Sequence, residues 1–194
     1  MGKNENLGPD FLGIGAQKAG TTWLYHQLKK HPDIYLPPVK DIHYFDRLTY
    51  PEYRSKHRQF HRMLKKFVRR GSDNPSWFLN YCFGKVDDDW YRSLFNSAKN
   101  RLAGEITPSY TTLRIREIRH VHRLNPNLKL ILTMRDPIDR AWSHYRMVLR
   151  KERLVHSELS ENEVIDILNR KVLAQKGNYA RSLERWLRVF KRDQ

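Results

Sequence analysis

The sequence predicts an α/β fold, a P-loop-type parallel β-sheet flanked by helices on both faces. Three observations support this prediction. Short apolar runs alternate with amphipathic segments, which is the pattern of βαβ units. The first apolar run, at 11–15, leads through a glycine-containing loop into an amphipathic segment. The length of 194 residues favours one domain with its own hydrophobic core.

Each predicted strand is a short apolar run. The strands cover 11–15, 34–36, 102–106 and 129–134, and the last, KLILTM, is the clearest buried strand. The predicted helices have apolar residues at helical spacing, and the segment GSDNPS interrupts them. They cover 21–30, 53–70, 87–98, 115–124, 136–151, 161–173 and 179–191. Proline marks two boundaries, since Pro32 stops the first helix and Pro137 lies in the first turn of the fifth.

The chain is strongly basic, with 37 Lys and Arg against 21 Asp and Glu and a net charge of +16. This balance suggests an anionic partner such as a nucleotide, a nucleic acid, an acidic membrane or an acidic polymer. A solvated basic surface is the other interpretation. The single cysteine, Cys82, excludes an internal disulfide and a cysteine-rich zinc site.

The sequence also bears on location. The first ten residues are polar and carry no apolar signal-peptide core. No run approaches the roughly 20 apolar residues of a membrane span. We therefore expect a cytoplasmic protein, with the alternative that the sequence is an excised domain from which an anchor could have been removed.

The loop between 15 and 21 has the glycine separation of a Walker A loop, but its lysine is displaced. Thr21 follows Gly20 directly, and Lys18 lies inside the loop. Backbone N–H groups and the hydroxyls of Thr21 and Thr22 suit a phosphate at the N-terminus of a helix. The alternative is a tight strand-to-helix turn that needs glycine for its geometry alone.

A second candidate for anion binding follows the strand at 129–134. Arg135 is expected at the carboxyl end of a parallel strand, where α/β sheets bind ligands, and its guanidinium can bind a phosphate with two hydrogen bonds. Ser143 lies about two helical turns further on. The alternatives are a salt bridge from Arg135 to Asp136 or Asp139, and an ordinary surface serine.

Two segments resemble motifs of one family. GAQKAGTTWLYHQLKKHPDI resembles the 5′-phosphosulfate loop of sulfotransferases that use 3′-phosphoadenosine 5′-phosphosulfate, and LILTMRDPIDRAWSHY resembles their 3′-phosphate motif. HPDIYLPPVKDIHYFD and GEITPSY are similar to the branch containing the heparan sulfate N- and 3-O-sulfotransferases and bacterial relatives. The resemblance covers nearly the whole chain. It implies one domain over 1–194 that is incomplete at its C-terminus, because the family continues through another strand and a basic loop.

The resemblance also implies the roles of individual residues. The donor would be 3′-phosphoadenosine 5′-phosphosulfate and the product adenosine 3′,5′-bisphosphate. Separately, we expect no metal, because a sulfuryl group carries less charge than a terminal phosphoryl group and the loop has no Walker lysine-threonine pair. Donor contacts are implied for Lys18, Ala19, Gly20, Thr21, Thr22, Trp23, Arg135, Ser143 and Tyr179. Asp41 lies where this branch usually has a glutamate general base, with His43 as the rival. Without the resemblance, Asp41 would be a loop aspartate capping a turn or pairing with Lys40.

The acceptor is a hydroxyl or an amine of a glycan or a small molecule, and an acidic glycan would suit the basic segment 53–70. Ile106 stands where some glycan-modifying members have lysine, which weakens the case for a heparan-like acceptor. Two alternatives remain. A P-loop kinase or NTPase would need a metal-binding carboxylate where Arg135 stands. A basic nucleic-acid-binding module would need a recognition motif, and none is visible.

Overall fold

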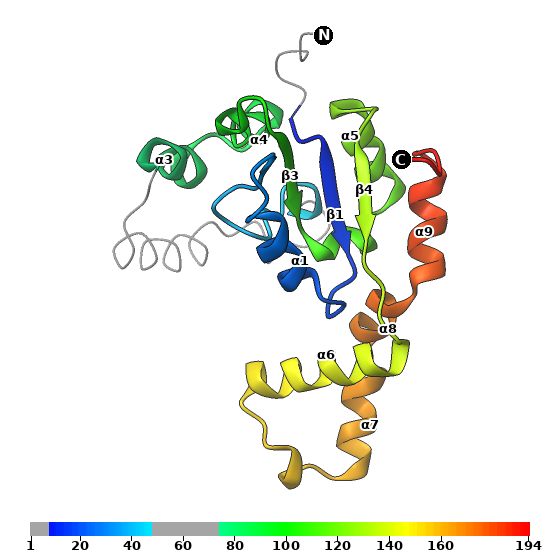
Figure 1. The fold of residues 1–194 in the computed structure, drawn as a ribbon. Helices are drawn as coiled ribbons and strands as arrows, with labels where there is room; N and C mark the ends of the chain where they lie inside the picture. Colours follow the sequence, from blue (N-terminus) through cyan, green and yellow to red (C-terminus); the bar gives the residue numbers. More distant parts are fainter. Residues whose placement is uncertain (1–7, 48–73) are drawn as a thin grey trace.

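A parallel four-stranded sheet forms the centre of the computed structural model, which describes residues 8–47 and 74–194 (Figure 1). The strand order is β2-β3-β1-β4, and every neighbouring pair is parallel. The strands are β1 (Phe11–Gly15), β2 (Ile34–Tyr35), β3 (Leu102–Ile106) and β4 (Lys129–Leu132). The predicted fold class is confirmed.

Helices cover both faces of this sheet. They are α1 (Thr21–Leu28), α3 (Pro75–Phe83), α4 (Asp88–Ser93), α5 (Ile115–Leu124), α6 (Pro137–Glu152), α7 (Glu161–Asn169), α8 (Lys171–Gly177) and α9 (Tyr179–Leu187). Short 3-10 turns are η1 (Phe45–Arg47), η3 (Asn96–Ala98), η4 (Pro108–Thr112) and η5 (His156–Glu158). Successive residues of β1 point to opposite faces. Phe11 therefore packs with α1, whereas Leu12 joins the larger core formed with α3, α4, α5 and α9.

Helices α6, α7 and α8 form a separate layer beyond the carboxyl ends of the strands (Figure 1). This layer has a small apolar core of its own, built around Tyr145, Leu149, Ile167 and Leu173. The layer fixes α6 across the end of the sheet. The helix therefore faces the loop that leaves β1, although the two segments are more than 100 residues apart in the sequence.

The structure corrects several predicted elements. The helix expected at 87–98 ends at Ser93 and is followed by η3, and the helix expected at 161–173 breaks at Arg170 into α7 and α8. The strand predicted as the clearest buried one, β4, lies at the edge of the described sheet, with Lys129 exposed and its other residues half-buried. The apolar run of β4 indicates that the strand packs against other elements through its faces. It carries no information on how many strands pair with its edges. The helix expected at 53–70 lies outside the described residues.

The helix α3 had no counterpart among the predicted elements. The sequence GSDNPS indicated a break, yet it also supplies the start of this helix. The Asn74 side chain accepts a hydrogen bond from Trp77 N at 3.0 Å, and Pro75 occupies the first turn. Asparagine before proline is an N-terminal signal as well as a turn signal. Cys82 is half-buried against the main core.

Candidate functional site

The loop from β1 to α1 depends on glycine at two positions. Gly20 caps α1 with a φ of 84°, in the left-handed region that glycine adopts without strain. Gly15 has a φ of 145°, and a Cβ there would lie 2.7 Å from the carbonyl oxygen of Pro108. No side chain caps α1 and its first turn contains no acid. The N-terminal amides of α1 and their partial positive charge are therefore available to an anion.

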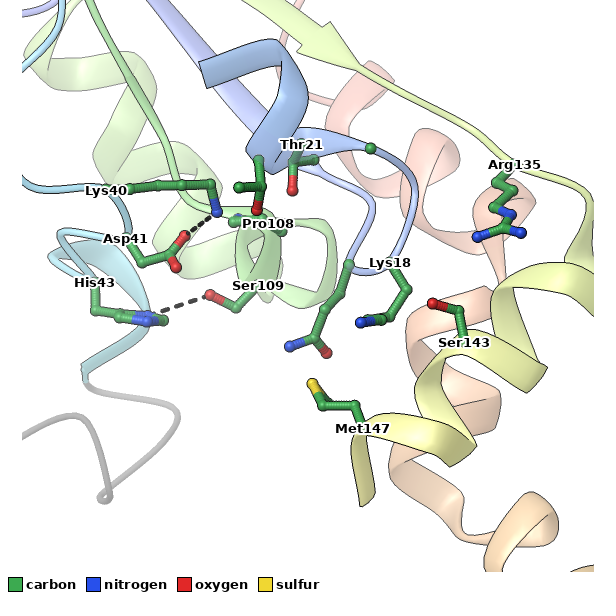
Figure 2. Close-up of a pocket in the computed structure, with 13 residues that line it drawn as sticks. Lys18, Thr21, Lys40, Asp41, His43, Pro108, Ser109, Arg135, Ser143 and Met147 are labelled. Atoms are coloured by element: carbon green, nitrogen blue, oxygen red, sulfur yellow. Dashed lines mark hydrogen bonds and ion pairs between the residues drawn. The ribbon is translucent and has the colours of Figure 1, made fainter. Parts of the chain in front are cut away.

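A cavity of about 440 Å³ opens beside this loop. Figure 2 shows residues from α1, from the segment after β2, from η4 and from α6 converging on it. Its lining comprises Gln17, Lys18, Gly20, Thr21, Thr22, Lys40, Asp41, His43, Pro108, Ser109, Arg135, Ser143 and Met147. The cavity thus brings together both segments that the sequence suggested for anion binding and both candidate bases.

Lys18 and Arg135 make one side of the cavity cationic. Burial lowers the pKa of Lys18, and the charges of Arg150, Arg135 and Arg146 lower it further. An anion bound beside this lysine would stabilise its protonated form, because the negative charge offsets the effects of burial and of the neighbouring positive charges. Thr21 and Ser143 place hydroxyl groups on the same side (Figure 2).

Arg135 forms the salt bridge to Asp139 that the sequence offered as an alternative to anion binding. The Nη2–Oδ2 distance is 3.2 Å, and the two side chains are 44% and 64% exposed. An exposed pair of this kind contributes at most about 1 kcal/mol. A phosphate can therefore compete with Asp139 for the guanidinium.

Three residues expected to contact the donor do not line the cavity. Ala19 is buried, and its N–H is bonded to the carbonyl oxygen of Ala16 at 3.2 Å. Trp23 is 68% exposed on α1. Tyr179, at the start of α9, holds the backbone of Arg135: its hydroxyl accepts from Arg135 N at 3.3 Å and donates to Arg135 O at 3.0 Å. In this structure Tyr179 positions Arg135.

The opposite side of the cavity carries the candidate bases. Asp41 Oδ1 accepts a hydrogen bond from Lys40 Nζ at 2.8 Å, so the pairing suggested as an alternative for Asp41 is present. His43 Nδ1 lies 2.8 Å from Oδ2 of the buried Asp46 and 3.3 Å from Ser109 Oγ. Asp41 and His43 both have positive φ, 62° and 57°. Such strained non-glycine backbone is typical of functional sites.

A buried hydrogen-bond network supports the loop that carries these bases. The Glu105 carboxylate accepts from the hydroxyls of Tyr91 at 2.6 Å, Thr107 at 2.8 Å and Tyr110 at 3.0 Å. The Tyr110 hydroxyl also accepts from the backbone N–H of Tyr44 at 3.1 Å. Burial raises the pKa of Glu105 to about 7. The hydrogen bonds of Glu105 and Tyr110 join the end of β3 to the segment between Asp41 and η1.

Sequence reasoning did not propose as site residues four residues that line or support this cavity: Lys40, Asp46, Glu105 and Ser109. The spacing His-x-x-Asp in KDIHYFD places Asp46 one turn after His43, and could have suggested the pair. Nothing local signals that Ser109 would meet them, because it comes from a segment more than 60 residues away. Residues 8–47 and 74–194 contain no cluster of three or more potential metal ligands.

Comparison with known proteins gives consistent matches. A family model described as "Sulfotransferase family" matches residues 9–194. Heparan sulfate glucosamine 3-O-sulfotransferase 3B1 of Mus musculus is 29% identical over 191 residues, which cover 94% of this chain and 38% of the mouse protein. The membrane-associated sulfotransferase kil1 of Dictyostelium discoideum is 30% identical over 142 residues, 73% of this chain and 23% of kil1.

The fold comparison agrees with the sequence matches. The crystal structure of a sulfotransferase from Alicyclobacillus acidocaldarius superposes with a TM-score of 0.64 at 27% identity, covering 96% of this chain and 70% of that one. The chain spans well under half the length of the mouse and Dictyostelium relatives.

In the part of the chain that the structure describes, no helix is both long and apolar enough to cross a membrane.

Proposed function

Because the chain belongs to the sulfotransferase family, we propose that it transfers a sulfuryl group from 3′-phosphoadenosine 5′-phosphosulfate to a hydroxyl or amine of an acceptor. One observation carries this proposal. A single cavity is lined by two sets of anion-binding side chains, Lys18 with Thr21 and Arg135 with Ser143, and by Asp41 opposite them. A donor with two separated phosphate positions and an acceptor that loses a proton require such an arrangement.

The donor would be held at two points. The amides at the start of α1, with Lys18, Thr21 and Thr22, suit the phosphosulfate. Arg135 and Ser143 suit the 3′-phosphate, since a guanidinium and a hydroxyl both donate hydrogen bonds to phosphate oxygens. Tyr179 keeps Arg135 in place through its two backbone hydrogen bonds.

The transfer needs a base and a stabilised leaving group. The acceptor oxygen or nitrogen forms a bond to sulfur while the bond between sulfur and the phosphate oxygen breaks, and the phosphate keeps the electron pair. We assign the acceptor's proton to the Asp41 carboxylate, with Lys40 holding that carboxylate in place. Lys18 and the loop amides stabilise the shifting negative charge. His43, oriented by Asp46, remains the rival base.

The acceptor is the least constrained part of the proposal. The mouse relative is named for heparan sulfate glucosamine, and we propose a glycan acceptor for this chain. Ile106, where some glycan-modifying relatives have lysine, is fully buried in the core between the sheet and α1. Because isoleucine carries no charge, any cationic contact with the acceptor must come from another residue of the chain. The cytoplasmic location and the incomplete C-terminus stay predictions from the sequence.

Binding of the nucleotide product tests the proposal directly. Adenosine 3′,5′-bisphosphate should bind in calorimetry, and Arg135→Ala should weaken that binding by about 2–4 kcal/mol, the loss expected for charged hydrogen bonds to a phosphate. Asp139→Asn is the matched control, because it removes the competing carboxylate and should leave affinity equal or higher.

Two outcomes would overturn the proposal. One is equal affinity for adenosine 5′-phosphate, which lacks the 3′-phosphate. The other is stabilisation of the folded chain by ATP with magnesium but not by adenosine 3′,5′-bisphosphate, which would favour the kinase alternative. Transfer of radiolabelled sulfate in the presence of a chelator then tests the expectation that no metal is needed.

A further inference from the structure

Helix α6 carries a second cavity on the flank next to the donor site. The cavity measures about 540 Å³ and lies between α6 and the segment 154–156. Ser143 and Met147 of α6 face the donor cavity, whereas Trp142, Arg146 and Arg150 line the second one. At 3.6 residues per turn the two arginines lie between these two faces. The donor cavity and the second cavity are therefore neighbours around one helix.

The second cavity has a fixed aromatic wall. Trp142 is 45% exposed and stacks on Tyr145, with ring centroids 5.0 Å apart and an interplanar angle of 25°. The His156 ring meets Trp142 edge-on at 5.8 Å, and its Nδ1 lies 2.7 Å from the Tyr145 hydroxyl. The indole is held from two sides and still open to solvent. Such a ring can stack against the apolar face of a sugar or another ring.

The two arginines supply positive charge beside that wall. Both are exposed, and within residues 8–47 and 74–194 neither forms an ion pair with a carboxylate. Their charges act on Lys18, which places them close to the donor loop. Arg150 Nε donates to the backbone carbonyl oxygen of Arg146 at 3.3 Å, and the spacing of four residues puts the two side chains on one face of α6. Paired guanidinium groups suit a carboxylate or a sulfate.

We infer that this flank of α6 is a second acceptor subsite, which binds an acidic saccharide unit next to the unit that receives the sulfuryl group. The sugar ring would pack on Trp142, and its carboxylate or sulfate would pair with Arg146 and Arg150. This inference rests on the proposed function and extends it to a specific occupant. A single indole beside two cations suits one saccharide unit better than a nucleic-acid strand, which is usually bound along a row of aromatic residues.

Calorimetry on the chain saturated with adenosine 3′,5′-bisphosphate tests the subsite, with an N-sulfated heparosan hexasaccharide as the probe. The double variant Arg146→Gln, Arg150→Gln should bind the hexasaccharide at least about tenfold more weakly, because two charged hydrogen-bonding groups are lost. Arg119→Gln, which removes an exposed arginine of α5, is the matched control and should leave the affinity unchanged.

The aromatic wall has a separate test. The hexasaccharide should change the tryptophan fluorescence of the wild-type chain, and Trp142→Phe should abolish most of that change while keeping the fold. A neutral hexasaccharide, chitohexaose, should bind much more weakly than the acidic probe.

The outcomes separate the subsite from the proposed function. A chain that binds adenosine 3′,5′-bisphosphate but shows no hexasaccharide binding, or a less than threefold loss in the double variant, overturns the subsite alone. Tighter binding of a 12-nucleotide single-stranded RNA through the same two arginines would also overturn it. Failure to bind the nucleotide refutes the proposed function, whereas hexasaccharide binding measured without nucleotide still tests the subsite.

Discussion

The buried carboxyl group of Glu105 should make the stability of this chain depend on pH. Glu105 is 2% exposed, and burial raises its pKa from the ordinary 4.5 to about 7 against the opposing effect of three hydroxyl donors. The charge of Asp46 raises it further, and Tyr81, Tyr91 and Tyr110 are titratable groups that also interact with Glu105. Replacing Glu105 by glutamine removes the ionisation while keeping the size of the side chain.

The sign follows from proton binding. Between pH 4.5 and 7 the unfolded chain has released the proton that folded Glu105 still holds, so folding stability contributed by this group is present below pH 4.5 and is lost as pH rises through 7. A shift of this size corresponds to about 3 kcal/mol. The glutamine has no such loss. Its NH2 group, however, cannot accept the hydroxyl hydrogen bonds that a carboxyl oxygen accepts, which should cost a pH-independent penalty of about 1–3 kcal/mol.

Urea denaturation followed by tryptophan fluorescence, at four pH values from 4.5 to 7.5 and constant ionic strength, measures this difference. Glu105→Gln should be less stable than the wild type at pH 4.5 and should recover about 3 kcal/mol relative to it by pH 7.5. Glu184→Gln, with a side chain 59% exposed, is the control and should differ from the wild type by less than about 1 kcal/mol throughout. A free-energy difference between wild type and Glu105→Gln that stays constant with pH would refute the reasoning.

Three further predictions concern the site and its surroundings. Burial lowers the pKa of His144 to about 4, so the stability contributed by the neutral imidazole is lost as pH falls from 6.5 towards 4. In the same urea titration, His144→Asn should reduce the loss of unfolding free energy at acid pH by about 2 kcal/mol. Asp41→Asn should slow single-turnover transfer by about 10²–10⁴-fold without weakening nucleotide binding, and His43→Ala should slow it less; the reverse ranking would transfer the role of base to His43. Tyr179→Phe removes both hydrogen bonds to the Arg135 backbone and should reduce the preference for adenosine 3′,5′-bisphosphate over adenosine 5′-phosphate by about tenfold; an unchanged preference measured by calorimetry would contradict a positioning role.

Local patterns in the sequence determined the elements that contain their own signals. The apolar run and glycines around β1 predicted the strand, the loop and the start of α1, because the left-handed turn at Gly20 and the helical spacing after it are properties of a few neighbouring residues. The bounds of α5 were predicted to the residue for the same reason. The segments that we propose to bind the anionic donor, which contain Lys18 and Arg135, were visible as motifs of one family.

Tertiary structure alone decided how these segments meet. The layer of α6, α7 and α8 turns Ser143 towards the loop of Lys18, and the sheet order places η4 beside the segment after β2, so Ser109 reaches His43 and Asp46. The edge position of β4 likewise depends on which strands pair with it. Periodicity reports which face of an element is apolar, but it contains no information on which distant segment covers that face or completes a hydrogen bond, because such contacts arise only when the whole chain has folded.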